Sequence, residues 1–463
     1  MTRRPPNVLF LMSDEHRADF AGFAGHPHVR TPTLDALAAT ACRFDAAYTP
    51  SPICVPARQC VAAGKLPQAC GVERYGQDLP PGSMTFARWF AAHGYETVCC
   101  GKLHHMGADQ MQGWTQRPAG DLAVGADARG LRPDAYRPDA SGGAGGGGKW
   151  SDAKEVRRAG TGRGPNDDTD ALATEAALRF VDRWFTDPEY DRPRAQTPLL
   201  LKLSLCRPHY PYLTDPERFA RFLNRVDPFV EEPPLDHPFL AGHRVAVGGD
   251  GPDAVSEREA RRATAAYCGM IEQLDADLGR LVARLEHNGQ DLDDWVVVYT
   301  SDHGEMLGQH GVWEKQVFFE GSARVPLLVK APGQRAPARI PRNVSLCDLF
   351  ATLCDLAGLP MPEASEAAGG PGFDSRSLAP LMRGEDPGWE DTAASEFGGT
   401  NLMLKRGSLK YHAYDRDDCR APEHRELLFD LAADPTERTN AIADPAHAEA
   451  LAGFRAERDR RGF

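Results

Sequence analysis

Five side chains capable of metal-binding or acid–base chemistry stand just past the ends of predicted strands. They are Asp14, Glu15, His209, Asp302 and His303. The apolar runs before them lie at residues 8–12, 198–205 and 295–300. Ligands bind beyond the carboxyl ends of the strands in an open α/β sheet, so we expect these side chains to converge. Carboxylates and imidazoles gathered at one site could bind a divalent cation or transfer protons.

Cys54 is the cysteine whose surroundings point to chemistry. The eleven cysteines include no CxxC pair that suggests zinc, and most lie in apolar runs, where we expect small core residues. The stretch from Cys54 to Arg58 reads CVPAR and follows the tripeptide SPI. A nucleophile at Cys54 would have an arginine one helical turn later, where its guanidinium could neutralise charge.

The CVPAR stretch resembles the sulfatase signature C-x-P-x-R, in which the cysteine is oxidised to formylglycine before the chain folds. The resemblance continues, in family order, through residues 7–14, 31–45, 54–71, 101–104, 208–209, 301–315 and 428–440. It implies an alkaline-phosphatase-like α/β sandwich that hydrolyses a sulfate ester. It also implies a maturation partner, a formylglycine-generating enzyme, that would modify Cys54.

The resemblance further implies one divalent cation, bound by the diol of the modified Cys54 and by four side chains. These are Asp14, Glu15, Asp302 and His303. Hard oxygen donors favour Ca²⁺, with Mg²⁺ or Mn²⁺ as alternatives, and the nitrogen of His303 improves the case for Mn²⁺. Glu15 departs from the family, which usually has Asp, Asn or Gln there, although it could still coordinate through one oxygen.

Basic side chains complete the implied site. The catalytic set comprises Cys54, Arg58, Lys102, His104, His209 and Lys315. The two lysines would bind sulfate oxygens and stabilise charge in the transition state, and Arg58 would hold the diol. By the same resemblance, His209 would protonate the leaving alkoxide and His104 would assist breakdown of the sulfated intermediate. His310 is a candidate for the pocket wall.

The sequence indicates the type of reaction more closely than it indicates the substrate. Residues 101–114 look like the choline-sulfatase branch, which recognises a quaternary ammonium through aromatic rings and carboxylates. Trp114, Tyr136 and Trp150 could supply such contacts or merely anchor a loop, so choline sulfate is one candidate among alkyl, aryl and sugar sulfates. One alternative is a phosphonate monoester or phosphodiester hydrolase of the same superfamily, although Lys102 and His104 favour a sulfatase. A non-catalytic binding protein with an unmodified cysteine is the other.

The elements that must position these residues alternate between strands and helices. Helices are predicted at residues 33–41, 84–93, 169–185, 257–287 and 345–356, with further strands at 97–100 and 325–330. Repeated βα units predict a large, mostly parallel sheet flanked by helices within residues 1–384. The Gly-rich stretch 115–168 is expected to be an insertion, either a loop without a role or a lid over the site. Short strands and a charged last helix predict a small C-terminal α+β domain at 385–463.

Composition limits the partners. The 463 residues carry a net charge of −13, which argues against a nucleic-acid partner but allows an anionic substrate in a locally basic site. The apolar run at residues 8–12 is too short for a secretory signal, and no run is long enough to span a bilayer. We therefore expect a cytoplasmic protein with no membrane partner. A homo-oligomer is compatible with the sequence, which does not define the oligomeric state.

Overall fold

The computed structural model describes most of the chain. The described residues are 4–120, 151, 153–186, 197–229, 235–248, 251, 254–366, 370, 372–386, 388–415, 419 and 424–463. Most of the predicted insertion, with Tyr136 and Trp150, lies outside them. The two ends of that stretch belong to the regular fold, because they contain strand β4 (Gln116–Ala119) and the start of helix α7 (Pro165–Thr186).

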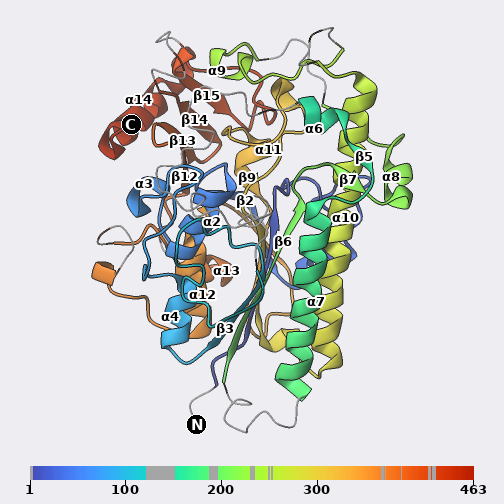
Figure 1. Cartoon of the computed structure of the whole chain (residues 1–463). Coiled ribbons are helices and arrows are strands. Elements are labelled where there is room, and N and C mark those ends of the chain that lie inside the picture. Colours follow the sequence, from blue (N-terminus) through green and yellow to red (C-terminus); the bar gives the residue numbers. More distant parts are fainter. Residues whose placement is uncertain are drawn as a thin grey trace.

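A large sheet forms the centre of the molecule, with strand order β11-β2-β10-β8-β1-β6-β3-β4 (Figure 1). Besides β4, its strands are β1 (Val8–Asp14), β2 (Cys42–Tyr48), β3 (Glu96–Gly101), β6 (Leu199–Pro208), β8 (Val296–Ser301), β10 (Leu327–Lys330) and β11 (Ala338–Ser345), and β9 (Arg324–Val325) pairs with β2. β1 runs parallel to both of its neighbours, β6 and β8, whereas β10 is antiparallel to β8 and β2. The prediction of a mostly parallel sheet is confirmed, and β2, β4 and β11 are additional to the predicted strands.

Both faces of the sheet are covered by helices. α7 and α10 (Glu257–His287) lie against one face, and α2 (Cys54–Ala63), α4 (Phe86–Ala92) and α12 (Leu349–Ala357) lie against the other (Figure 1). Successive side chains of a strand point to opposite faces. Accordingly Phe10 of β1 packs in the core beside α4, and Leu9 and Leu11 pack in the core beside α7 and α10. β1 is therefore buried on both faces, and its carboxyl end is held in place from both sides.

A second, antiparallel sheet follows near the C-terminus. Its order is β12 (Thr392–Phe397), β13 (Asn401–Arg406), β14 (Leu409–Ala413) and β15 (Glu426–Asp430). The last helix, α14 (Ala448–Arg461), stacks Phe454 on Tyr411 of β14 with ring centroids 5.5 Å apart. The predicted small C-terminal domain is present, and its proposed boundary at residue 385 stays a prediction.

Short elements complete the described chain. They are α1 (Pro32–Ala38), α3 (Pro67–Cys70), α6 (Ala153–Arg157), α8 (Pro216–Phe222), α9 (Pro238–Ala241), α11 (Glu320–Ala323), α13 (Ala379–Met382), β5 (Gly160–Thr161) and β7 (Leu213–Thr214). Among the described helices, none combines the length and the apolar composition needed to cross a bilayer.

Candidate active site

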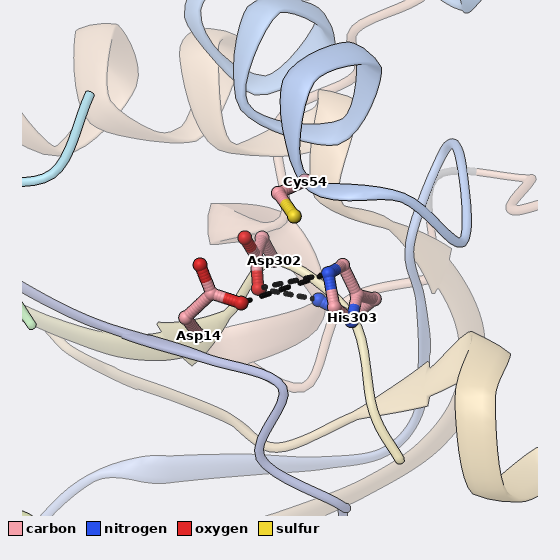
Figure 2. Close-up of side chains that lie close together, drawn as sticks. All are labelled: Asp14, Cys54, Asp302 and His303. Atoms are coloured by element: carbon pink, nitrogen blue, oxygen red, sulfur yellow. Dashed lines mark hydrogen bonds and ion pairs between the residues drawn. The ribbon is translucent and has the colours of Figure 1, made fainter. Parts of the chain in front are cut away.

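The predicted site residues meet beyond the carboxyl ends of four neighbouring strands. Asp14 is the last residue of β1, and the positions just past β3, β6 and β8 are occupied by Lys102, His209 and Asp302. Since β1 is central, the ends of its neighbours surround Asp14. Cys54, the first residue of α2, directs its sulfur toward the side chain of Asp302 (Figure 2). Residues separated by almost three hundred positions are thereby brought to one point, as the sequence predicted.

Four buried side chains form a possible metal site. Ligand atoms of Asp14, Cys54, Asp302 and His303 all lie within 4.8 Å of one another (Figure 2). His303 Nδ1 donates to the carbonyl oxygen of Gly304 at 3.0 Å, which leaves Nε2 directed at the carboxylates, 3.7 Å from Asp14 Oδ1. Neither Asp14 Oδ1 nor His303 Nε2 has a hydrogen-bond partner among the described residues. Buried polar atoms are normally satisfied, so this donor set fits a divalent cation.

Glu15 lies on the other side of Asp14. It shares a second group of possible ligands with Asp14 and His209, and it is absent from the four-residue group. Its carboxylate forms an ion pair with Lys315, with Oε1 and Nζ 3.1 Å apart. Its backbone has a positive φ of 67°, and the Tyr267 hydroxyl donates to its carbonyl oxygen at 2.6 Å. The metal-ligand role predicted for Glu15 stays a prediction, and the ion pair with Lys315 is an additional finding.

Cys54 occupies the amino-terminal end of a helix. Ile53, the residue before α2, has extended backbone angles, so the chain turns into the helix at Cys54. Burial and Asp14 raise the pKa of the Cys54 thiol, but Lys102, Lys315 and the neighbouring His303 outweigh them and lower it below its ordinary value. The positive end of the helix dipole acts in the same direction.

Arg58 holds the carboxylates of the site together. Its Nε donates to Asp302 Oδ2 at 2.7 Å, and its Nη2 lies 3.2 Å from Asp14 Oδ2. Its Nη1 donates to the carbonyl oxygen of Lys102 at 2.9 Å and to Ser204 Oγ at 2.8 Å. One guanidinium thereby links the ends of β1, β3, β6 and β8 beneath the helix that carries Cys54. Ser204 lies at the end of a predicted strand, and that position is the signal that could have identified it.

Lys102 and His104 approach from the segment after β3. Lys102 Nζ is 2.5 Å from Asp14 Oδ2, and although burial lowers the pKa of this lysine, Asp14 raises it well above the ordinary value. His104 is buried edge-on to the ring of Tyr75, and burial together with Lys102 lowers its pKa well below the ordinary value. At neutral pH the pair therefore presents one ammonium and one neutral imidazole.

His209 and Lys315 form the third part of the site. Lys315 Nζ donates to His209 Nε2 at 2.8 Å, and His209 Nε2 lies 3.5 Å from Glu15 Oε2. Lys315 Nζ also lies 4.5 Å from the ring centre of Tyr210. Burial lowers the pKa of Lys315, but Glu15 raises it further, so this side chain is an ammonium. Tyr210 was not among the predicted site residues, although it directly follows His209.

Two other candidates have different surroundings. Trp114 is 5 % exposed and packs edge-on against Phe86 in the core of the sheet, so of its two expected roles the structure favours anchoring over contact with a quaternary ammonium. His310 is completely buried, and its ring packs 4.2 Å from that of Phe319. Its role in a pocket wall stays a prediction.

The fold and the matches to known proteins define the class of enzyme to which this chain belongs. The helix-flanked parallel sheet and the C-terminal antiparallel sheet are those of an alkaline-phosphatase-like hydrolase. The family model described as Sulfatase matches residues 6–359, and the model described as "N-sulphoglucosamine sulphohydrolase, C-terminal" matches residues 308–460. The chain therefore belongs to the sulfatase family, whose members hydrolyse sulfate esters.

Similar proteins agree with this family. The chain is 32 % identical to a choline-sulfatase of Rhizobium meliloti (strain 1021), across 100 % of this chain and 87 % of that protein. It is 26 % identical to arylsulfatase K of Homo sapiens, across 94 % and 79 % of the two chains. Among solved structures, a phosphonate monoester hydrolase of Agrobacterium radiobacter superposes with a TM-score of 0.74 at 25 % identity, covering 98 % and 94 % of the chains.

Proposed function

We propose that this protein hydrolyses a sulfate ester with a formylglycine derived from Cys54 and with one divalent cation. The observation that carries the proposal is the group of Cys54, Asp14, Asp302 and His303, whose ligand atoms lie within 4.8 Å of one another. Nucleophile and metal ligands are thus side by side, as a metal-activated attack requires. The CVPAR stretch supports the modification of Cys54.

The cation would be held by Asp14, Asp302 and His303, with Glu15 as a further candidate. It would supply Lewis-acid stabilisation and favour deprotonation of the attacking hydroxyl, and the hydrated formylglycine would supply that hydroxyl. Arg58, which bonds both Asp14 and Asp302, holds the two carboxylates in one orientation. The carboxylates favour Ca²⁺, with Mg²⁺ or Mn²⁺ as alternatives, and the imidazole of His303 improves the case for Mn²⁺.

The two ammonium groups near Cys54, those of Lys102 and Lys315, would bind the sulfate. Lys102 contacts Asp14, and Lys315 contacts Glu15, so each ammonium is oriented by a buried carboxylate. Preorganised charges of this kind stabilise the negative charge that develops on transferred oxygens. His209, hydrogen-bonded to Lys315, would deliver the proton to the departing alkoxide, and His104 would assist release of sulfate.

The alcohol portion is proposed from similar proteins. A choline-sulfatase matches the whole of this chain, and arylsulfatase K matches most of it. Choline sulfate and aryl sulfates are therefore the first esters to test. A phosphonate monoester is the second candidate, because a phosphonate monoester hydrolase superposes on 98 % of the chain. Lys102 and His104 still favour sulfate.

Two measurements on one preparation test this function. The Cys54 peptide from protein produced with a formylglycine-generating enzyme should weigh about 18 Da less than the unmodified peptide, because aldehyde replaces thiol. The same preparation should turn over choline sulfate or 4-nitrophenyl sulfate faster than phenylphosphonate monoesters. A Cys54→Ala variant is the matched control for contaminating activity. Full activity with unmodified Cys54 would contradict the mechanism, and faster phosphonate turnover would favour the second candidate.

A further inference from the structure

Glu305 is a buried carboxylate that has no role in the reaction described above. It follows β8 by four residues, and its side chain is completely shielded from solvent. Oε1 accepts hydrogen bonds from the backbone N–H groups of Leu307 at 2.8 Å and Glu314 at 2.7 Å. Oε2 accepts one from the Tyr212 hydroxyl at 3.0 Å. Buried polar atoms are normally satisfied by such partners, and these three bonds fix the orientation of the Glu305 side chain.

The bond to Glu314 bears directly on Lys315. Glu314 has a positive φ of 68°, which an L residue adopts only when its surroundings hold it there. The Glu305 carboxylate accepts its N–H, and the N–H of Met306 donates to its carbonyl oxygen at 2.7 Å. Glu314 is thus held at both ends of its peptide backbone. The next residue is Lys315, so the direction of the lysine side chain depends on this clamp.

Glu305 also contacts the segments that carry His209 and Glu15. Tyr212 lies three residues after His209, and its hydroxyl is bound to Glu305. Arg17, two residues after Glu15, donates from Nη1 to the carbonyl oxygen of Glu305 at 2.9 Å. One residue therefore connects the three segments whose side chains meet at Lys315.

We propose that Glu305 is a positioning residue that sets the geometry of Lys315 and His209 for the proposed sulfate ester hydrolysis. It acts through the backbone of Glu314 and the hydroxyl of Tyr212, and it touches no substrate because it is fully buried. Lys315 Nζ lies 2.8 Å from His209 Nε2 and 3.1 Å from Glu15 Oε1, so all three groups depend on one lysine position. The inference rests on the proposed function.

A double-mutant cycle tests this role. Misplacing a reacting group by about 1 Å can cost roughly 100-fold in rate, so Glu305→Ala should lower kcat by roughly 10- to 100-fold. In a Lys315→Ala background the same change should lower kcat for a nitrophenyl sulfate by less than roughly threefold. This ester needs little help from His209, so the remaining effect of Glu305 passes through the missing lysine. Equal losses in the two backgrounds would overturn the proposal and leave Glu305 with a general structural role.

Two more conservative variants distinguish a positioning role from a loss of activity caused by misfolding. Glu305→Gln keeps the size of the side chain and an acceptor for the two N–H groups, so it should retain more activity than Glu305→Ala. Tyr212→Phe removes only the hydroxyl and should lower the turnover of an alkyl sulfate more than that of a nitrophenyl sulfate, through His209. Equal losses on the two esters with Tyr212→Phe, or no recovery with a folded Glu305→Gln variant, would contradict the proposal.

A matched control comes from another buried carboxylate. Asp348 is 1 % exposed and accepts the backbone N–H groups of Ser345 and Arg376, each at 2.9 Å. Asp348→Ala should lower thermal stability without changing the ratio of alkyl to nitrophenyl turnover. Formylglycine and metal contents of every variant are measured alongside. A fully active wild type with unmodified Cys54, or a modified, metal-loaded wild type without sulfatase activity, would contradict the proposed function. Additive losses in an active, modified enzyme would contradict only the role of Glu305.

Discussion

Lys315 donates a hydrogen bond from Nζ to Nε2 of His209, 2.8 Å away, and His209 Nδ1 donates to the carbonyl oxygen of Tyr210 at 2.6 Å. The imidazole is therefore neutral, with its proton on Nδ1. Burial, together with the neighbouring Lys315, lowers the pKa of His209 well below its ordinary value. His209 can therefore act as an acid only after Nε2 gains a proton, and the bond from Lys315 orients the ring with Nε2 toward the site.

His209→Ala should slow alkyl sulfates far more than nitrophenyl sulfates. An alkoxide must be protonated as its bond to sulfur breaks, whereas a nitrophenolate leaves readily without help. We expect a loss of roughly 100- to 10,000-fold in kcat/KM for the alkyl ester, the usual range for general acid catalysis, and a much smaller loss for the aryl ester. The measurement is kcat/KM for both esters, under conditions where the chemical step limits the rate.

Lys315→Ala is the comparison for that experiment. Its ammonium would bind sulfate oxygens that every substrate shares, so both esters should lose a similar factor of roughly 100- to 1000-fold. A loss confined to the alkyl ester would instead assign Lys315 to proton transfer. Equal losses on both esters with His209→Ala would remove His209 from the acid role.

Asp302→Asn should remove the cation and most of the activity. In the wild type, the backbone N–H groups of Glu15 and His303 donate to Asp302 Oδ1 at 3.1 and 2.9 Å. The amide of the variant keeps the size of the side chain and an acceptor oxygen for these bonds, but it removes the negative charge. We expect turnover to fall by roughly 100- to 1000-fold while the fold persists. Elemental analysis after dialysis and circular dichroism are the measurements. A variant with full metal content, or an active wild type without any divalent cation, would contradict this prediction.

Arg58→Lys should be damaging even though the charge is retained. The guanidinium contacts two carboxylates, a hydroxyl and a backbone carbonyl, and a single ammonium cannot reach all of them. Losing these buried, charge-assisted hydrogen bonds should reduce the free energy of unfolding by about 3 kcal/mol. Thermal unfolding without added metal is the measurement. An unchanged melting temperature would show that Arg58 does not hold the carboxylates in place.

His412 should make the protein less stable in mild acid. It is completely buried on β14, and burial, Lys410 and two neighbouring histidines lower its pKa well below 6.5. The unfolded chain then binds the proton first, so stability is present above pH 6.5 and is lost as the pH falls below it. Between about pH 7.5 and about pH 5.5 the loss from this residue is about 1.4 kcal/mol.

The matched variant for this prediction is His412→Gln, which cannot titrate. Its unfolding free energy, measured in urea at the same two pH values, should fall by about 1.4 kcal/mol less than that of the wild type. The comparison concerns the pH dependence, so a uniform change in stability caused by the amide does not affect it. Parallel pH profiles of the two proteins would contradict a neutral, buried His412.

Local sequence patterns were sufficient to predict most of the central strands of the sheet. The central strands β1, β6 and β8 are short apolar runs between polar segments, and α10 begins where Ser256 and Glu259 form a capping box. β11 was not predicted because it is an edge strand that contains arginines and a proline. Buried and exposed residues alternate irregularly along it. β2 mixes charged and small residues with apolar ones, and it becomes a strand by pairing with β10 and β11. Such pairing depends on residues distant in the sequence.

By itself, the sequence indicated which candidate residues would lie together beyond the strand ends. Asp14 ends a strand, Lys102, His209 and Asp302 each follow one, and parallel strands must bring their carboxyl ends to one edge. Only the tertiary structure decided which side chains pair at that edge. The bonds of Lys315 to Glu15 and His209 join segments at least one hundred residues apart, and their geometry depends on backbone turns and on packing. The sequence indicates where strands end, but it does not indicate which buried donor forms a hydrogen bond with which acceptor.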